Sequence, residues 1–273
     1  MLIMDQEGRS AAGSGKWAVV LGASSGFGSA VSARLAAEGY NICGVHLDRR
    51  STMALADRAR EAVEEAGVES LFFNVNAVDR DKMTLVLDQL EPLAGVDGVS
   101  LLFHSLAFGS LAPLVGEDAS ASARDSQMAM TLNVMASSLV AWTQELAWRR
   151  LLGEGSRVMA MTSAGSTRAA PSYGMVSAAK AALEAYVRQL ALELGPRGVA
   201  VNAIRAGVTD TPALAHIPGA ADLKEHARSV NPGGRLTEPG DIAELVSLLM
   251  QPGGTWLTGN VLGVDGGEDI AAG

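Results

Sequence analysis

The stretch WAVVLGASSGFGSAVSARLAAEG, residues 17–39, decides the fold. It begins with a short and wholly apolar run, WAVVL, which is typical of a strand covered on both faces of a sheet. A glycine-rich turn follows at 22–28, and the apolar residues beyond it recur with helical spacing. The stretch therefore predicts a buried strand, a tight turn and a helix in succession.

The same alternation of short apolar runs and helix-length segments continues to the end of the chain. Further strands are expected at 41–47, 70–75, 99–105, 157–163, 199–205 and 260–266, and longer helices at about 125–152 and 174–194. A strand–helix–strand succession predicts parallel strands joined by right-handed crossovers, with ligands at their carboxyl ends. We predict the α/β class, with one doubly wound parallel sheet of about seven strands and helices on both faces.

The composition argues against several kinds of partner and site. The 273 residues carry 21 basic and 30 acidic side chains, a net charge of −9, which argues against nucleic-acid and membrane partners. No apolar run reaches the roughly 18 residues of a membrane span, and the start lacks a signal-peptide pattern. The single cysteine, Cys43, fits a reducing compartment, and four scattered histidines suggest no metal site. We expect a cytoplasmic protein with a flexible tail at 1–15 and one domain over 16–273.

The glycine-rich turn has the properties of a phosphate-binding site. Glycines allow the backbone to approach a pyrophosphate, and the first turn of the next helix offers free N–H groups and a partial positive charge. Although the spacing is G-x-x-x-G-x-G rather than G-x-G-x-x-G, the strand before it and the helix after it predict dinucleotide binding. The residues assigned to this site are Gly22, Ser24, Ser25, Gly26, Phe27 and Gly28.

Several motifs together resemble one family. GASSGFG, Asn133, Ser163, Tyr173, Lys180 and the terminal VDGG at 264–267 resemble the short-chain dehydrogenases/reductases over about residues 16–270. The resemblance implies a single Rossmann-like NAD(P)-binding catalytic domain, a nicotinamide cofactor and often a homotetramer. Tyr173 would then be the hydrogen-bond donor to the substrate. Lys180 would hold the nicotinamide ribose and lower the pKa of the phenol by its charge.

The end of the second strand bears on the choice of nicotinamide cofactor. In HLDRR, residues 46–50, Asp48 is suited to accept from both ribose hydroxyls of NADH, whereas Arg49 and Arg50 are suited to pair with the 2′-phosphate of NADPH. The relatives that use NADH are expected to carry their acid nearer His46. This comparison favours NADPH and keeps NADH as the alternative.

Other cofactor contacts follow from the same resemblance. After the third strand, Asn76 matches the family's aspartate beside the adenine, with Ala77 next to it, and Asn74 is the rival candidate. The segments beyond the fourth and sixth strands supply Ser105, Leu106, Ala107, Gly207, Val208 and Thr211. The family uses the last two positions for the nicotinamide carboxamide and the pyrophosphate. Thr211 has a structural alternative as the N-cap of the next helix.

Tyr173 and Lys180 in YGMVSAAK, residues 173–180, are seven positions apart instead of the family's usual four. The position four before the lysine is Val176, which has no proton to donate. Seven residues are about 700° of helical rotation, so both side chains share a face, but three extra residues add roughly 4.5 Å along the axis. The phenol should lie farther from the hydride carbon. That suits conjugate reduction, because negative charge then develops on the remote thioester oxygen.

The Y-x6-K pattern also resembles the enoyl-acyl-carrier-protein reductases, especially their third, NADPH-dependent type, as do HSLAF at 104–108 and AGVTDTPALAHIPGAADL at 206–223. This resemblance implies reduction of the 2,3 double bond of enoyl thioesters in fatty-acid synthesis, with acyl carrier protein or CoA as carrier. Ser163 and Asn133 match the ketoreductases, so a reductase of β-ketoacyl thioesters or steroids is the alternative. A non-catalytic dinucleotide sensor is a third hypothesis.

Residues 212–235 should form a mobile lid that excludes water from the substrate. Leu214, Ala215 and Ile217 on this lid are candidates to contact the acyl chain, together with Phe108 after the fourth strand and Tyr173 itself. Packing into the core is the alternative for the lid residues.

A carrier protein as partner would need a docking site. Acyl carrier proteins are acidic, so a basic spot is required although the net charge of this chain is negative. Lys224 and Arg228, spaced i, i+4 on the expected lid, are the candidates. A solvated helix face is the alternative for this pair.

Overall fold

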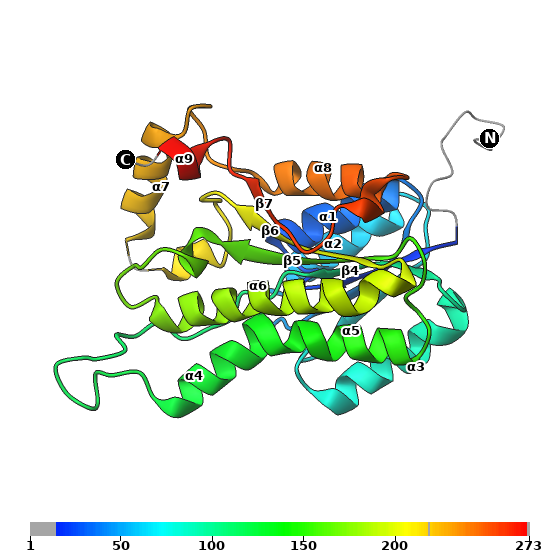
Figure 1. Ribbon diagram of the computed structural model, residues 1–273, viewed down its shortest axis with the longest axis horizontal. Coiled ribbons are helices and arrows are strands. Elements are labelled where there is room, and N and C mark those ends of the chain that lie inside the picture. The colour runs from blue at the N-terminus through cyan, green and yellow to red at the C-terminus, as the bar shows by residue number, and fades with distance from the viewer. Residues whose placement is uncertain (1–14, 218, 272–273) are drawn as a thin grey trace.

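The computed structural model describes residues 15–217 and 219–271 and confirms the predicted sheet. Its strands are β1 (Trp17–Leu21), β2 (Asn41–His46), β3 (Ser70–Asn74), β4 (Val99–His104), β5 (Arg157–Ser163), β6 (Ala200–Ala206) and β7 (Val261–Val264). They are parallel and lie in the order β3-β2-β1-β4-β5-β6-β7 (Figure 1). The strand order reverses beside β1, where a doubly wound sheet binds its ligand. Residues 1–14 of the predicted tail lie outside the described residues.

The helices cover both faces of the sheet. They are α1 (Gly26–Ala37), α2 (Met53–Glu64), α3 (Arg80–Ala94), α4 (Asp125–Leu132), α5 (Ser138–Trp148), α6 (Gly174–Leu194), α7 (Ala220–Val230), α8 (Pro239–Met250) and α9 (Glu268–Ala271). In Figure 1, α1, α2 and α8 lie on one face, and α3, α5 and α6 lie on the other. This layering confirms the doubly wound α/β prediction.

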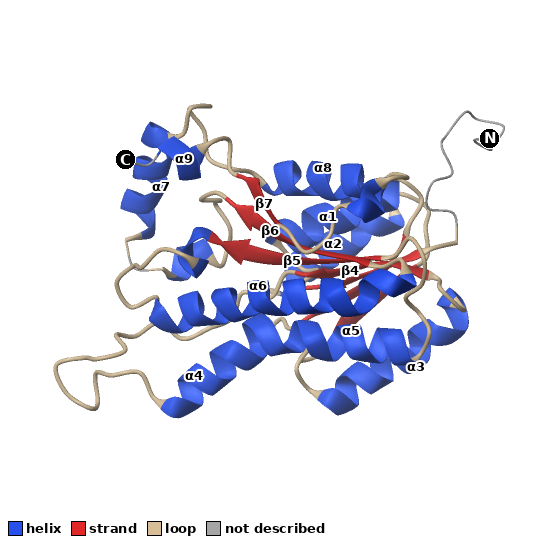
Figure 2. Ribbon diagram, in the orientation of Figure 1, coloured by secondary structure: helices blue, strands red, loops and turns tan. Residues whose placement is uncertain are grey.

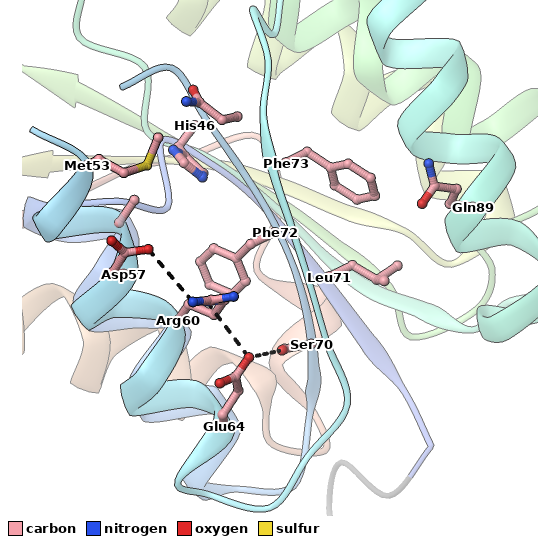
Figure 3. Close-up of a pocket in the computed structure, with 12 residues that line it drawn as sticks. His46, Met53, Asp57, Arg60, Glu64, Ser70, Leu71, Phe72, Phe73 and Gln89 are labelled. Carbon is pink, nitrogen blue, oxygen red and sulfur yellow. Dashed lines mark hydrogen bonds and ion pairs between the residues drawn. The ribbon is translucent and has the colours of Figure 1, made fainter. Parts of the chain in front are cut away.

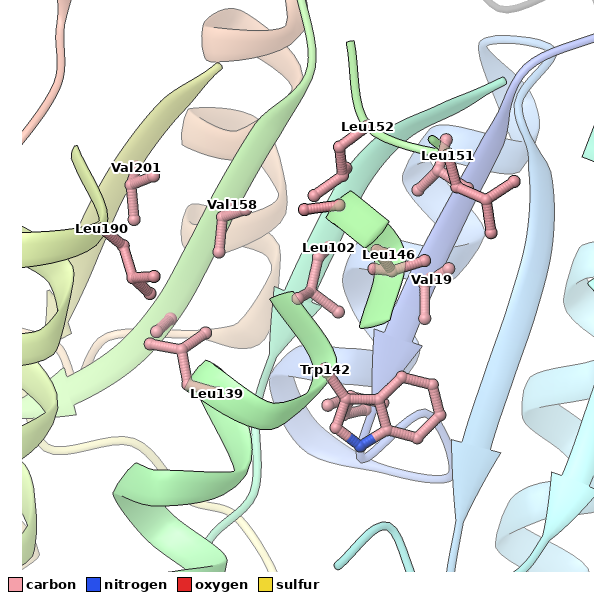
Figure 4. Close-up of a cluster of buried hydrophobic side chains, with 14 of the residues drawn as sticks. Val19, Leu102, Leu139, Trp142, Leu146, Leu151, Leu152, Val158, Leu190 and Val201 are labelled. Atoms are coloured by element: carbon pink, nitrogen blue, oxygen red, sulfur yellow. The ribbon is translucent and has the colours of Figure 1, made fainter. Parts of the chain in front are cut away.

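Each face of the sheet packs into its own apolar core. On the face of α5, Val19 of β1 and Leu102 of β4 belong to one buried cluster with Leu139 and Trp142, as Figure 4 shows. Val20, the next residue on β1, points to the opposite face and belongs to the cluster with α1 and α8. Full burial of such a side chain contributes about 1.5–3 kcal/mol. Because both faces of β1 are covered, every position of WAVVL is apolar.

The helix predicted at 125–152 is interrupted in the structure. A π-helical turn at Asn133–Ser137 separates α4 from α5. The second helix ends at Trp148, because Arg150 adopts a left-handed backbone with φ of 58°. The apolar pattern alone did not reveal this turn, although such turns are frequent near functional sites.

The carboxyl ends of the strands gather at one edge of the molecule. In Figure 2 the arrowheads of β5, β6 and β7 point toward α7, α9 and the long loop before α4. No helix within 15–217 and 219–271 is long and apolar enough to cross a membrane. Those same ranges contain no group of three or more His, Cys, Asp or Glu side chains that could hold a metal ion.

Candidate functional site

The turn after β1 can be built only from glycine at two positions. Gly22 has φ of +88°, and a Cβ on it would lie 2.4 Å from the carbonyl oxygen of Ser105. A Cβ on Gly28 would lie 2.1 Å from the carbonyl oxygen of Gly22. The side chain of Ser25, the N-cap of α1, makes no capping hydrogen bond. The start of α1 therefore presents N–H groups beside a glycine cradle, an arrangement that fits a dinucleotide pyrophosphate.

Segments that follow two other strands, β4 and β6, meet this turn. Ser105 donates its backbone N–H to Leu21 at 2.9 Å, which places the predicted Ser105–Ala107 segment against the cradle. A Cβ on Gly26 would lie 3.5 Å from Cγ2 of Thr211, so Thr211 lies over the cradle as well. Thr211 Oγ1 also accepts from the N–H of Leu214 at 3.3 Å, and so makes the capping contact of the structural alternative. The two predicted roles of Thr211 are therefore compatible.

Asp48 is held firmly at the end of β2. Its carboxylate lies 2.9 Å from Nδ1 of His46, and its backbone N–H and carbonyl pair with the Asn74 amide at 2.9 and 3.0 Å. Burial favours a higher pKa for Asp48, but hydrogen bonds with Thr52, Ser24 and His46 outweigh it and hold the pKa below its usual value. The carboxylate therefore stays ionised beside the glycine turn.

The other residues predicted to contact the adenosine half of the cofactor are more exposed to solvent. Arg49 and Arg50 are exposed. The exposed Asn76 accepts from the N–H of Val78 at 3.2 Å, whereas the Asn74 amide is already paired with the backbone of Asp48. The carbonyl of the neighbouring Ala77 accepts from the Trp142 indole at 2.8 Å, a buried contact that sequence reasoning missed. Asn76 is therefore the one of the two rival asparagines with a side chain still open to a ligand.

A cavity of about 390 Å³ lies at the outer edge of β3 (Figure 3). Its walls carry Phe72 and the ion pairs of Arg60 with Asp57 and Glu64, at 3.7 and 3.9 Å. None of the residues assigned to catalysis lines it. The cofactor and catalytic residues lie instead along the open edge formed by the strand ends.

Tyr173 and Ser163 are brought together beyond the end of β5. Tyr173 immediately precedes α6, and a Cβ placed on Gly165 would lie 2.6 Å from Cε1 of its ring and 3.2 Å from Oγ of Ser163. The buried Ser163 Oγ has no well-formed hydrogen bond with a described residue. Burial raises the pKa of the Tyr173 phenol, and the Ser163 hydroxyl opposes that rise. The pKa of the phenol is therefore raised and not lowered as predicted, and the charge of Lys180 is not among the causes of the shift.

Lys180 reaches the same strand two residues earlier. Its buried ammonium donates to the carbonyl oxygen of Met161 at 2.8 Å. Burial lowers the pKa of Lys180 to about 8, against the opposing charge of Glu184. Two strand residues span about 6.6 Å, so Tyr173, beside Ser163, lies farther out along β5 than Lys180. Tyr173 is the N-cap of α6 and Lys180 lies within that helix, so both residues are placed near the last residues of β5.

Val176 occupies the position four before Lys180 and is buried. It belongs to a small apolar cluster with Met135 and Ala179, against which Tyr173 and Leu111 pack. The valine side chain has no proton to donate. Tyr173 is therefore the acid candidate that the fold presents beside Lys180.

His104, at the end of β4, is a buried site residue that sequence reasoning missed. Its Nε2 lies 2.8 Å from Oγ of Ser138, which in turn donates to the Val134 carbonyl at 2.8 Å inside the π-helical turn. Burial, and then the charge of Lys180, lower the pKa of His104 to about 3, so the ring stays neutral. Asn133 opens the same turn but is exposed, and its side chain makes no hydrogen bond with another described residue.

The predicted substrate residues are spread around this edge. Leu214 is buried and Ile217 partly buried, whereas Ala215 is exposed. Phe108 is 65% exposed on the loop after β4. From the same loop, Leu114 closes over the start of α6, since a Cβ on Gly174 would lie 2.9 Å from its side chain. Leu114 and Leu111 therefore wall the Tyr173 side of the site, a contact over 60 residues of sequence that no local pattern signals.

The predicted lid contains α7, and one of its two basic candidates is already paired with an acid. The Lys224 ammonium lies 3.1 Å from Asp210 Oδ1. Arg228, four residues on, is exposed on the same helix. The predicted docking spot therefore retains one cation without such a pairing among the described residues. Pro218, within the predicted lid, lies outside the described residues.

Gly165→Ala should displace the Tyr173 ring without unfolding the protein. The added methyl group would lie 2.6 Å from ring carbon Cε1, so the ring must move. We expect kcat to fall at least about tenfold, with the melting temperature little changed. Gly240→Ala is the matched control, because a Cβ there has no neighbour within 4 Å. Equal kcat values for the two variants would show that the position of the ring is unimportant.

The comparisons with known proteins agree with this geometry. A family model described as enoyl-(acyl carrier protein) reductase matches residues 22–268. The NADH-dependent enoyl-[acyl-carrier-protein] reductase FabI of Nostoc sp. is 32% identical over 201 residues, 74% of this chain and 76% of that protein. Versicolorin reductase 1 of Dothistroma septosporum is 26% identical over 264 residues, 93% of this chain and 95% of that protein. A solved short-chain dehydrogenase of Burkholderia cenocepacia in complex with NADP is 27% identical, with a TM-score of 0.78 and coverage of 94% and 98%.

Proposed function

Because the chain belongs to the short-chain dehydrogenase/reductase family, in its enoyl-acyl-carrier-protein reductase branch, we propose that it reduces the 2,3 double bond of enoyl thioesters. The observation that carries this proposal is the place of Tyr173. The ring lies beside Ser163, while Lys180 contacts Met161, two residues earlier on β5. The family membership alone makes the protein an NAD(P)H-dependent oxidoreductase.

The residues present fit a nicotinamide dinucleotide. A Cβ at Gly22 or Gly28 would fill the cradle, and Thr211 closes over it. The cofactor, when bound, supplies the hydride that the reaction adds to the β-carbon of the substrate. Asp48 and Arg49 would face the adenosine end, and Lys180 the nicotinamide ribose.

Tyr173 and Lys180 have separate roles in the reaction. Hydride addition at the β-carbon places negative charge on the thioester oxygen, several bonds away. The phenol O–H of Tyr173 donates a hydrogen bond to that oxygen, and a proton from solvent, added at the α-carbon, completes the reduction. The Lys180 ammonium, charged below about pH 8, holds the ribose hydroxyls and adds positive potential to the site. Leu111 and Leu114 keep water from the Tyr173 side.

Reduction of a carbonyl is the second candidate function. Ser163 lies beside Tyr173 and its hydroxyl has no well-formed partner, so it is available as a second donor to a carbonyl oxygen. The chain is also similar over 93% of its length to versicolorin reductase 1, a reductase whose name specifies no enoyl thioester. Hydride would then go to the carbon that bears the oxygen, and the donor would have to lie closer to it.

Steady-state kinetics with crotonyl and acetoacetyl thioesters separates these functions. We expect a higher kcat/KM for the crotonyl thioester when both are measured with NADPH at matched concentration. Faster turnover of the acetoacetyl thioester would replace enoyl reduction by ketoreduction. No oxidation of NADPH with either thioester would favour a dinucleotide sensor.

The proposed cofactor is NADPH, and NADH is the alternative. The Asp48 carboxylate is already engaged by His46 at 2.9 Å, whereas Arg49 is exposed and its side chain pairs with no acid among the described residues. A free guanidinium next to the ribose site suits a 2′-phosphate, with which it forms charge-assisted hydrogen bonds.

Arg49→Ala should weaken NADPH binding selectively. Loss of a charged hydrogen bond costs about 1.5–3 kcal/mol, so we expect the Kd for NADPH to rise about 10- to 100-fold. The Kd for NADH should stay within about twofold, because NADH has no 2′-phosphate. Fluorescence titration measures both constants, and Arg58→Ala, an exposed arginine on α2, is the control. A parallel loss of NADH binding would contradict this assignment.

The natural carrier and the assembly are also proposals. We propose an acyl carrier protein thioester as substrate, with the CoA thioester as the alternative, in a cytoplasmic homotetramer. Trp148 on α5 and Leu192 on α6 are 67% and 72% exposed, and the two helices lie side by side. Such exposed apolar side chains on neighbouring helices support burial between subunits.

A further inference from the structure

The chain after β7 turns at two consecutive glycines. Gly266 and Gly267 have φ of +62° and +87°, a backbone that glycine adopts without strain. They lead into α9, which lies beside the ends of β6 and β7 (Figure 1). Two consecutive acids, Glu268 and Asp269, open this helix.

Glu268 holds the loop that follows β6. Its carboxylate oxygens lie 3.0 and 3.3 Å from the backbone nitrogen of Val208, which donates to them. A Cβ on Gly207 would lie 2.8 Å from Glu268 Oε2 and 2.6 Å from Oγ1 of Thr237, so the carboxylate fits closely over this loop. Burial raises the pKa of Glu268, and the Val208 N–H opposes the rise. Because Gly207 has no side chain to restrain the loop, its position depends on such outside contacts.

Asp269 joins this loop to the segment that carries Tyr173. Its two carboxylate oxygens pair with Arg168 and Arg205, each at 2.8 Å. The Asp269 carbonyl also accepts from Arg168 at 2.7 Å. Arg168 lies between Ser163 and Tyr173 in the sequence, and Arg205 is two residues before Gly207. Partly exposed ion pairs add little stability. The main effect of these contacts is therefore to hold the two segments in place.

We propose that Glu268 and Asp269 form a C-terminal clasp that positions the Gly207–Val208 loop and the Arg168 segment for cofactor binding. Neither acid touches the catalytic pair, so both act through the loops. The clasp rests on the proposed nicotinamide-dependent reduction, but not on which acceptor is reduced.

The Kd for NADPH and NADH, measured by fluorescence titration without any thioester, tests the clasp through Glu268. Glu268→Ala removes the acceptor of the Val208 N–H. We expect both Kd values, and the KM for the cofactor, to rise about tenfold or more, with kcat changed less. Glu268→Gln keeps an acceptor oxygen and should recover most of the loss. Ile270→Ala is the control, because this residue lies on the same helix and is 90% exposed.

Three results would overturn the clasp. Glu268→Ala with wild-type Kd values would show that the contact does not position the loop. Tighter cofactor binding would show that the carboxylate competes with the cofactor. An equal rise in Kd for Glu268→Gln and Glu268→Ala would show that an acceptor oxygen at this position does not matter. Because no thioester enters the titration, failure to reduce crotonyl thioesters would leave the clasp standing.

Discussion

Replacing Tyr173 with phenylalanine is expected to lower kcat about 10²- to 10⁴-fold, because the variant loses the one phenol that the described part of the chain presents near Lys180. The ring remains, so packing against Leu111 and Val176 is kept. The Kd of the cofactor should therefore change little. Stopped-flow single turnover with a crotonyl thioester measures the chemical step directly.

Tyr186→Phe is the matched control for Tyr173. Tyr186 lies on the same helix and is partly buried against the main core cluster, away from β5's last residues. It should turn over at the wild-type rate. A Tyr173→Phe variant that keeps kcat within a few-fold of wild type would remove Tyr173 from the mechanism. Ser163 would then be the donor to examine.

Lys180→Met should nearly abolish activity and yet raise stability. Among the described residues the buried ammonium makes one hydrogen bond, to the carbonyl of Met161. The charge of Glu184 offsets only part of the cost of burial, so the folded state carries a net desolvation cost. Methionine of similar length fills the same space without charge. We expect kcat/KM to fall about 100-fold or more, because the ribose anchor and its charge are lost. A gain in melting temperature should accompany that loss.

The pKa of Lys180 predicts how the stability gain of Lys180→Met depends on pH. Lys180 has a pKa of about 8 in the folded protein, below the 10.5 expected when unfolded. The unfolded state therefore binds more protons between these values, and wild-type stability rises with pH across that window. The advantage of Lys180→Met should be largest at pH 7 and shrink by pH 10. Wild-type kcat/KM should fall as pH rises through about 8, where the charge is lost.

Differential scanning fluorimetry at pH 7 and pH 10 checks the stability arm, and the pH–rate profile checks the activity arm. Lys224→Met is the control, because Lys224 lies partly exposed on α7 and pairs with Asp210 at 3.1 Å. A Lys180→Met variant that melts below wild type at pH 7 would show that the Met161 contact outweighs the burial of the charge.

Local sequence patterns were sufficient for the sheet. WAVVL and the other apolar runs predicted strands because both faces of each are buried, and burial on two faces removes alternation. The glycine turn was predicted from the approach of its backbone to a pyrophosphate, and the structure adds a close approach of backbone to backbone at Gly22 and Gly28. Helix geometry predicted that Tyr173 and Lys180 share a face, and in the structure Tyr173 is the N-cap of the helix that carries Lys180.

Contacts between distant segments escaped prediction. The π-helical turn adjoins a buried contact between His104 and Ser138, 34 residues apart, which no periodicity reveals. Glu268 reaches Val208 over 60 residues. The prediction that Lys180 lowers the Tyr173 pKa was wrong because it considered charge without burial. Burial is the largest cause of the shift in this pKa. Residue types indicated the chemistry, and only the fold showed which groups meet.

A competition experiment tests the central claim most directly: Tyr173, set far out along β5, serves the oxygen of a conjugated thioester. Equal amounts of crotonyl and acetoacetyl thioester are incubated with the enzyme and NADPH deuterated at the transferred hydrogen, and the products are resolved by mass spectrometry. The account predicts butyryl thioester with one deuterium at C3 and the acetoacetyl thioester intact. Deuterated 3-hydroxybutyryl thioester beside unreacted crotonyl thioester would contradict it.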